Sequence, residues 1–210
     1  MLHAKLRAAT GPYHTRLDAG MARLLFGPDL TRPSYSGLLH RLHAFVSGWE
    51  DRAAYATADA LPGLVDSRRK AGLLRDDLRA FDKPIDPVDC VPGEQLPALW
   101  SVAAALGSMY VMEGATLGGR VIAPRVRKQL GLTDDAGGTA YFESYGPAVN
   151  ARWREFLSTL ETAVPVDSHD AAVKAACDTF AAMERWLLAP ARPTKNSTDA
   201  MGVHDSSMLS

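Results

Sequence analysis

Apolar side chains in this chain recur at steps of three and four residues, the spacing of one face of an α-helix. Clear examples of the pattern begin at Leu2 and at Tyr35. No run alternates between apolar and polar residues with period two, so the sequence predicts no strand. We therefore expect an all-α fold, a single domain of seven or eight helices. The helical pattern covers residues 2–17, 35–49, 64–81, 99–112, 121–130, 148–160 and 171–188.

Turn-forming residues separate these segments. Residues 82–97 contain four prolines and residues 133–146 contain two adjacent glycines, both typical of turns. Beyond Pro190 the residues become small and polar, which is typical of a flexible tail. We expect one helical domain over residues 1–189 and a flexible polar tail over residues 190–210.

Composition narrows the class of protein. The chain has 210 residues, of which 47% are apolar and 22% charged, as in soluble globular proteins. The net charge of −1 argues against electrostatic binding of nucleic acid. Two cysteines, Cys90 and Cys177, are too few for a disulfide framework and fit a reducing cytosol. With no signal-peptide pattern and no apolar run of membrane-spanning length, we expect a cytoplasmic protein that binds no membrane.

The segment 110–120 carries Gly114, Gly118 and Gly119 among helix-forming residues. A glycine inside a helix is roughly 1 kcal/mol less favourable than alanine, so the three together cost about 3 kcal/mol. Gly114 and Gly118 lie one turn apart on one face, which leaves a strip of helix without side chains. Such a strip allows close approach of either another helix or a flat ligand.

Among six histidines, His14 is distinguished by Asp18 at position i+4. A histidine whose second nitrogen is held by a carboxylate is typical of a metal ligand, although a surface pair has the same spacing. Pro12 lies in the same segment, and we expect it to kink the helix or to restart it near Thr10.

Two other groups of side chains have ordinary explanations. His40 and His43 have the spacing of a shared metal site, but the chain lacks the Glu-x-x-His motif of di-iron bundles. A basic cluster after the glycines is either a solvated face or a docking patch for an acidic protein. Its members are Arg120, Arg125, Arg127 and Lys128.

His14 and the glycine segment, in this order and about a hundred residues apart, resemble the heme oxygenase family. The stretch Leu6-Arg7-x-x-Thr10-x-x-x-His14 is similar to that family's proximal helix. The stretch YVMEGATLGG is similar to its distal helix, in the form found in bacterial members, including those paired with phytochromes. The resemblance covers residues 2–188.

The resemblance implies that heme is clamped between these two helices. His14 Nε2 would ligate the heme iron, and Asp18 or a water would hold the other ring nitrogen. Gly114, Gly118 and Gly119 would let the distal backbone lie over the porphyrin. The implied reaction is the O2-dependent cleavage of heme to biliverdin, Fe2+ and CO.

Heme b would be both the substrate and the cofactor that activates oxygen. External electrons would come from a donor such as ferredoxin with ferredoxin reductase, and a phytochrome is an implied acceptor of the bilin.

The resemblance also implies pocket residues. Arg7 occupies a basic position that faces a heme propionate, whereas Gly11 replaces a second basic position. Arg152 or Arg154 would supply the other cation. Side chains expected to line the pocket are those of Tyr110, Phe180 and Met183.

Ala115 departs from the family pattern, because many members have an aspartate there to anchor distal waters. The network would then be held by backbone carbonyls near Gly114, by Arg120 or by Glu113. Ala115 also keeps open a heme-binding or carrier protein without turnover. A thiaminase-type hydrolase on the same fold is a third reading, with Cys177 as its nucleophile.

Overall fold

The computed structural model describes residues 1–81, 91–133 and 137–189, and every structural statement below concerns these ranges. Cys90 and the expected tail over residues 190–210 lie outside them. The described residues form eight α-helices and no strand, as predicted. The helices are α1 (Leu2–Phe26), α2 (Arg32–Thr57), α3 (Ala71–Arg79), α4 (Val102–Ala115), α5 (Gly119–Leu130), α6 (Ala140–Glu143), α7 (Val149–Ala163) and α8 (His169–Leu187). No helix in these ranges is both long and apolar enough to cross a membrane.

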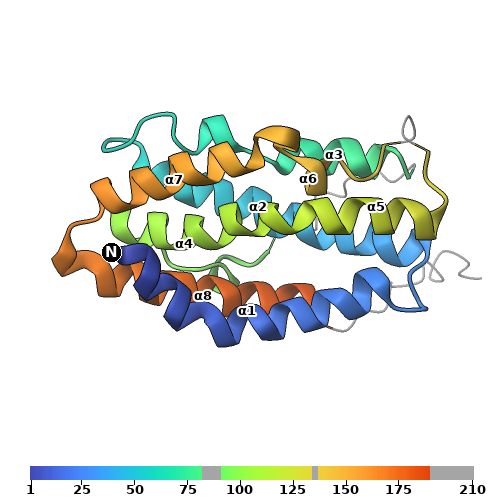
Figure 1. Ribbon diagram of the computed structural model, residues 1–210, viewed down its shortest axis with the longest axis horizontal. Helices are drawn as coiled ribbons and strands as arrows, with labels where there is room; N and C mark the ends of the chain where they lie inside the picture. Colours follow the sequence, from blue (N-terminus) through green and yellow to red (C-terminus); the bar gives the residue numbers. More distant parts are fainter. Residues whose placement is uncertain (82–90, 134–136, 190–210) are drawn as a thin grey trace, which may run out of the picture.

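Helix α4 is the centre of the bundle. In Figure 1 it lies between the pair α1 and α8 on one side and α7 on the other. Its closest neighbour is α8: a Cβ on Gly107 would lie only 2.0 Å from the carbonyl oxygen of Ala172. The backbones of the two helices are therefore in direct contact at Gly107, where no other residue fits.

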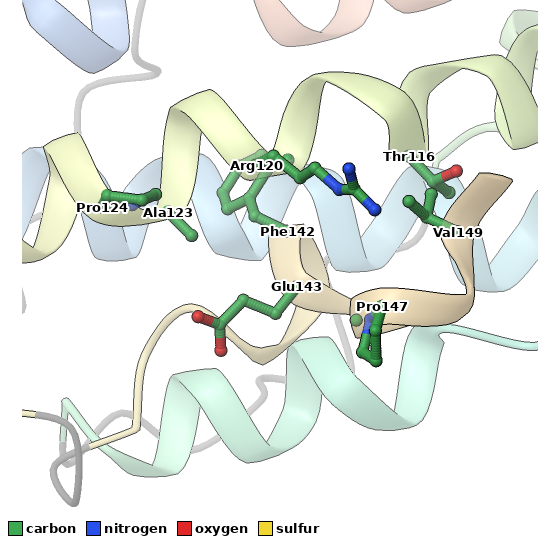
Figure 2. Close-up of a pocket in the computed structure, with 10 residues that line it drawn as sticks. Thr116, Arg120, Ala123, Pro124, Phe142, Glu143, Pro147 and Val149 are labelled. Carbon is green, nitrogen blue, oxygen red and sulfur yellow. The ribbon is translucent and has the colours of Figure 1, made fainter.

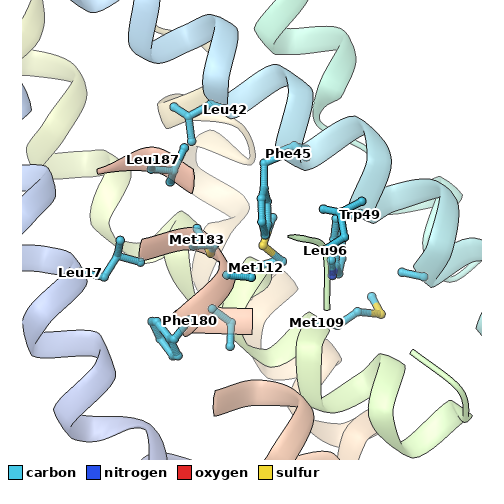
Figure 3. Close-up of a cluster of buried hydrophobic side chains, with 14 of the residues drawn as sticks. Leu17, Leu42, Phe45, Trp49, Leu96, Met109, Met112, Phe180, Met183 and Leu187 are labelled. Carbon is cyan, nitrogen blue, oxygen red and sulfur yellow. The ribbon is translucent and has the colours of Figure 1, made fainter. Parts of the chain in front are cut away.

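Large apolar side chains fill the space between α4, α2 and α8 (Figure 3). One polar chain crosses this core. The indole N–H of Trp49 donates to Ser108 Oγ at 2.7 Å, and the hydroxyls of Ser108 and Thr179 are also 2.7 Å apart. Each buried polar group here has a partner, so the chain links three helices without leaving a donor unsatisfied.

The N-termini of three helices are capped by a carboxylate from another helix. Glu161 of α7 caps α1, Glu50 of α2 caps α3, and Asp77 of α3 caps α6, through backbone N–H bonds of 2.5 to 3.2 Å. The first N–H groups of a helix have no partner within the helix, and they carry partial positive charge. These carboxylates thus fix where one helix starts relative to another.

Of the two alternatives predicted for Pro12, a kink or a restart of the helix near Thr10, the restart is wrong, because α1 continues through Pro12. The carbonyl left without its usual donor is that of Ala8, and since both residues are exposed, solvent can satisfy it. The segment predicted as a helix from residue 64 becomes α-helical only at Ala71. Turns and a short 3-10 segment, η1 (Asp66–Arg68), precede it, and the side chain of Arg68 points into the protein.

Candidate functional site

A groove of about 590 Å3 lies between α1 and the C-terminal end of α4, with side chains from α7 and α8 completing its walls. This volume is typical of a pocket for a small molecule or cofactor. Most of the residues predicted from the proximal and distal helices line it together. They are Arg7, His14, Asp18, Tyr110, Gly114, Phe180 and Met183.

His14 is oriented by two neighbours. Its Nδ1 lies 2.9 Å from an Asp18 carboxylate oxygen, which leaves Nε2 as the nitrogen available to a ligand. The ring of Phe180 meets the imidazole edge-on, with the centroids 5.8 Å apart. The His14 side chain is 60% exposed, so the groove is open on this side. The arrangement fits a metal ligand whose second nitrogen is held by a carboxylate.

The glycines at the end of α4 have ordinary helical backbone angles, so none is needed for its conformational freedom. A Cβ on Gly114 would lie 3.6 Å from Trp153, an ordinary contact, and Gly114 lines the groove. A side chain there would therefore occupy the groove rather than clash with the protein. Gly118 does not line the groove, and a Cβ on it would meet only Ile122, at 3.8 Å.

Glycine is required at position 119 by packing against another helix, not by the groove. A Cβ there would lie 1.7 Å from the carbonyl oxygen of Phe142, so α5 packs on the backbone of α6 at this point. A second pocket, of about 460 Å3, opens beside this contact. Figure 2 shows Arg120 beside α5, with Glu143 and Pro147 on the segment that faces this helix. Gly119 and Arg120 thus belong to this second pocket and not to the groove.

Two of the three expected anchors for a distal water network face away from the groove. Arg120 lies in the second pocket. The carboxylate of Glu113 is buried and bonded to Arg68, Lys70 and Tyr145. Only the backbone near Gly114 remains beside the groove.

Arg152 is also placed elsewhere. Its guanidinium donates to Glu155 at 3.0 Å and to the carbonyl of Ser67 at 2.8 Å, and it does not line the groove. Arg154, the other predicted cation of α7, is exposed and does not line the groove either. The residue that α7 turns toward the groove is Trp153.

His3 also lines the groove, one turn before Arg7, and was not predicted from the sequence. Its ring centroid lies 5.8 Å from that of Tyr110 and 6.2 Å from that of Trp153. Burial raises the pKa of Tyr110, which keeps this phenol neutral. A signal was present in the sequence, because positions 3, 7 and 14 share one face of a helix.

Within the described residues, the structure does not support the other two predicted chemistries. Cys177 does not line the groove: its thiol lies 3.8 Å from the carbonyl of Ala9, between α8 and α1, and burial raises its pKa. A raised pKa makes the thiol a poorer nucleophile. As for His40 and His43, no group of three or more metal-binding side chains occurs within the described ranges.

Comparison with known proteins decides the family. A family model described as heme oxygenase matches residues 1–189. The chain belongs to the heme oxygenase family. A curated heme oxygenase from Xanthomonas campestris pv. campestris (strain 8004) is 38% identical to it over 166 residues, which are 76% of this chain and 92% of that protein.

Two solved heme oxygenase structures share the fold. Heme oxygenase 2 from Chlamydomonas reinhardtii, solved without heme, matches with a TM-score of 0.74 and 20% identity, over 92% of this chain and 99% of its own. Heme oxygenase from Leptospira interrogans matches with a TM-score of 0.69 and 17% identity, over 89% and 98%. The predicted family and all-α fold are confirmed, and the thiaminase alternative finds no support.

Proposed function

We propose that this protein cleaves heme to biliverdin, Fe2+ and CO, using O2 and electrons from an external donor. The observation that carries the proposal is that the His14 imidazole and the side-chain-free backbone at Gly114 line one groove in a chain of this family. Helix α1 supplies the iron ligand and α4 supplies the close backbone.

On the proximal side, His14 Nε2 binds the heme iron. Asp18 accepts a hydrogen bond from Nδ1–H, which fixes the tautomer and raises the basicity of the ligand nitrogen. Phe180 packs against the imidazole and limits its rotation. The substrate iron is thus held at one height above α1.

On the distal side, the absence of a Cβ at Gly114 lets the macrocycle approach the backbone and gain dispersion contacts across its face. The neighbouring groove side chains Val111, Ala115 and Leu117 are apolar. An acid or base in contact with oxygen would favour cleavage of the O–O bond over attack on the ring. In this groove, waters on the α4 backbone carry the proton instead.

The charges of the groove orient the substrate. Arg7 lies seven residues before His14, or about 10 Å along the helix. Asp18 lies beyond His14 at the other end. We assign the propionate edge of heme to the Arg7 end, because carboxylates are attracted to the cation and repelled by Asp18. His3 extends this end and takes the place predicted for Arg152.

The electron donor that we propose is a ferredoxin with its reductase, and the proposed bilin acceptor is a phytochrome. The form of the sequence YVMEGATLGG, which resembles phytochrome-associated members, supports this acceptor. We propose a cytoplasmic location because two cysteines fit a reducing compartment.

Optical spectroscopy tests the proposal. Heme added to the purified protein should give the spectrum of a histidine-bound complex, and O2 with ferredoxin and its reductase, or with ascorbate, should yield a bilin that absorbs red light. Free heme with the same reductant is the control. A heme complex that stays intact under these conditions would reject turnover and support a heme-binding or carrier protein instead.

A further inference from the structure

A buried ion cluster lies behind the distal wall, on the side of α4 away from the groove. It consists of Arg68, Lys70, Glu113 and Tyr145. Arg68 and Lys70 each donate to the Glu113 carboxylate at 2.6 Å, and the Tyr145 hydroxyl donates to it at 3.0 Å. The side chains of Arg68 and Glu113 are each only 2% exposed.

Such a cluster is a poor source of stability. Removing charges from water costs several kcal/mol per ion, and apolar replacements of similar volume are often equally stable. What a buried ion cluster does supply is a fixed geometry, since each strong hydrogen bond accepts few alternatives. The geometry fixed here is that of the last turn of α4, because Glu113 is the residue before Gly114.

Residues 140–145, which include α6 and Tyr145, contact both sides of the 3-10 turn η3 (Thr116–Gly118). This turn separates α4 from α5. Before the turn, Tyr145 holds Glu113. After the turn, the carbonyl of Phe142 packs on Gly119. Figure 2 shows this segment facing α5 across the second pocket. Asp77 in turn fixes the position of this segment, because its carboxylate accepts hydrogen bonds from the first N–H groups of α6.

Aromatic rings connect the cluster to the groove itself. The guanidinium of Arg68 lies 5.8 Å from the centre of the Phe156 ring, and Phe156 stacks on Trp153 with the centroids 5.8 Å apart. Trp153 lines the groove and packs beside Gly114. The wall above the substrate is therefore supported by the cluster through both the backbone of α4 and the ring of Trp153.

We propose that Glu113, held by this cluster, is a positioning residue that sets the height of the Gly114 backbone over the heme and thereby selects the meso carbon that is attacked. The proposal rests on the proposed heme cleavage. Displacements of about 1 Å around a reacting centre change rates by up to about 100-fold, so a small shift of this wall redistributes attack among the four carbons.

The mildest test is Tyr145→Phe, which removes no charge. It removes the hydroxyl that donates to Glu113 at 3.0 Å and accepts from Lys70 Nζ at 3.1 Å. A second variant combines Glu113→Gln with Lys70→Met, which leaves the net charge of the cluster unchanged. The control is Ser108→Ala, which removes two buried hydrogen bonds from the same helix, about two turns before η3. For each variant we would measure the melting temperature, the heme spectrum and the biliverdin isomers, separated by chromatography.

We expect all three variants to bind heme through His14 with an unchanged spectrum. Only the cluster variants should change the isomer ratio, with the minor isomers rising about threefold in Tyr145→Phe, as a lost hydrogen bond allows. Restoring a hydrogen-bonding side chain with Tyr145→His should move the ratio back toward that of the wild type.

The outcomes separate the two proposals. Absence of bilin from the wild-type protein rejects the proposed function itself. If the wild type makes bilin but the cluster variants keep its isomer ratio, or shift it no more than Ser108→Ala does, the cluster is structural and the positioning role is rejected.

Discussion

The imidazole of His14 lines the groove with one nitrogen held by Asp18, which leaves its other nitrogen available to iron. We expect His14→Ala to weaken heme binding by at least about tenfold, as loss of a ligand or its support does at metal sites, and to abolish turnover. Added imidazole should restore the histidine-type spectrum. A heme titration followed in the visible range measures both effects.

The matched control for this variant is His40→Ala, because His40 lies on α2 and does not line the groove. It should bind heme as the wild type does. An unchanged spectrum in His14→Ala would instead move the ligand role to another histidine.

Alanine at Gly119 and alanine at Gly118 should have opposite effects on the free energy of unfolding. Gly119→Ala should lower the free energy of unfolding by about 1–3 kcal/mol or more, because its Cβ has no space beside Phe142. Gly118→Ala should raise it by up to about 1 kcal/mol, since alanine is the better helix former and nothing obstructs it. Denaturant titrations measure both changes. Equal effects at the two positions would contradict the packing role of Gly119.

Gly114 should affect the substrate rather than the fold. Gly114→Leu places a side chain in the groove, so we expect loss of heme binding while the melting temperature of the heme-free protein changes little. A heme titration beside a melting curve separates these effects, with Gly118→Ala as the control. Normal heme affinity in Gly114→Leu would contradict the close approach of the backbone.

How far single residues could be predicted depended on whether their helix face was known. His14 and Asp18 follow helical spacing, and Arg7 was implied by the resemblance to the family, so all three were predicted for the site that they line. Arg152 could not be excluded in this way, because the rotation of α7 depends on its packing. That rotation turns Trp153 to the groove and leaves Arg152 beside Glu155.

At the scale of elements, the start of α1 depends on a carboxylate from α7. Burial acts to raise the pKa of Glu161, but the N–H groups of His3 and Leu2 outweigh it, and the net pKa is lowered. A lowered pKa means that the capping contribution is complete above the ordinary value of 4.5 and disappears as the pH falls through the lower folded value.

Glu161→Ala should therefore lower the free energy of unfolding at pH 7 by about 1 kcal/mol, the usual effect of losing a helix cap. The difference from the wild type should shrink as the pH is lowered below 4.5. Denaturant titrations at several pH values measure this, with exposed Glu94→Ala as the control. A difference that stays constant down to pH 3 would contradict a charged cap.

The predicted elements failed where long-range pairing decided the structure. Segments 35–49 and 121–130 are helical as expected, and the segment predicted from residue 99 is helical from Val102. Gly131 ends α5 in the left-handed conformation that a C-cap requires. Residues 64–70 had the composition of a helix but turn inward, because Arg68 and Lys70 meet Glu113, more than forty residues away. The spacing of apolar and polar residues within one segment cannot predict an ion pair with a residue so distant in the sequence.

At the scale of the whole molecule, burial differs strongly between the two walls of the groove. Helix α4 is buried along most of its length, whereas α1 buries only six of its 25 residues. Amides of α4 should therefore exchange hydrogen most slowly, and those of α1 faster.

Addition of heme should slow exchange around His14 and around Gly114, because the ligand joins the two walls. Hydrogen exchange with mass spectrometry measures this, and the exposed end of α2 around Tyr55 is the internal control. Protection of the region around His40 and His43 alone would place the ligand elsewhere.

The contact between Gly107 and Ala172 has a consequence for engineering. Phe180 and Met183 stand on the same helix as Ala172, two to three turns further along, so the separation of α4 and α8 also sets the width of the cavity. A methyl group at position 107 would overlap the backbone of Ala172 and would have to push α8 away from α4. Any redesign of the cavity therefore has to keep glycine at position 107, because a side chain there would displace α8 and the lining residues that it carries.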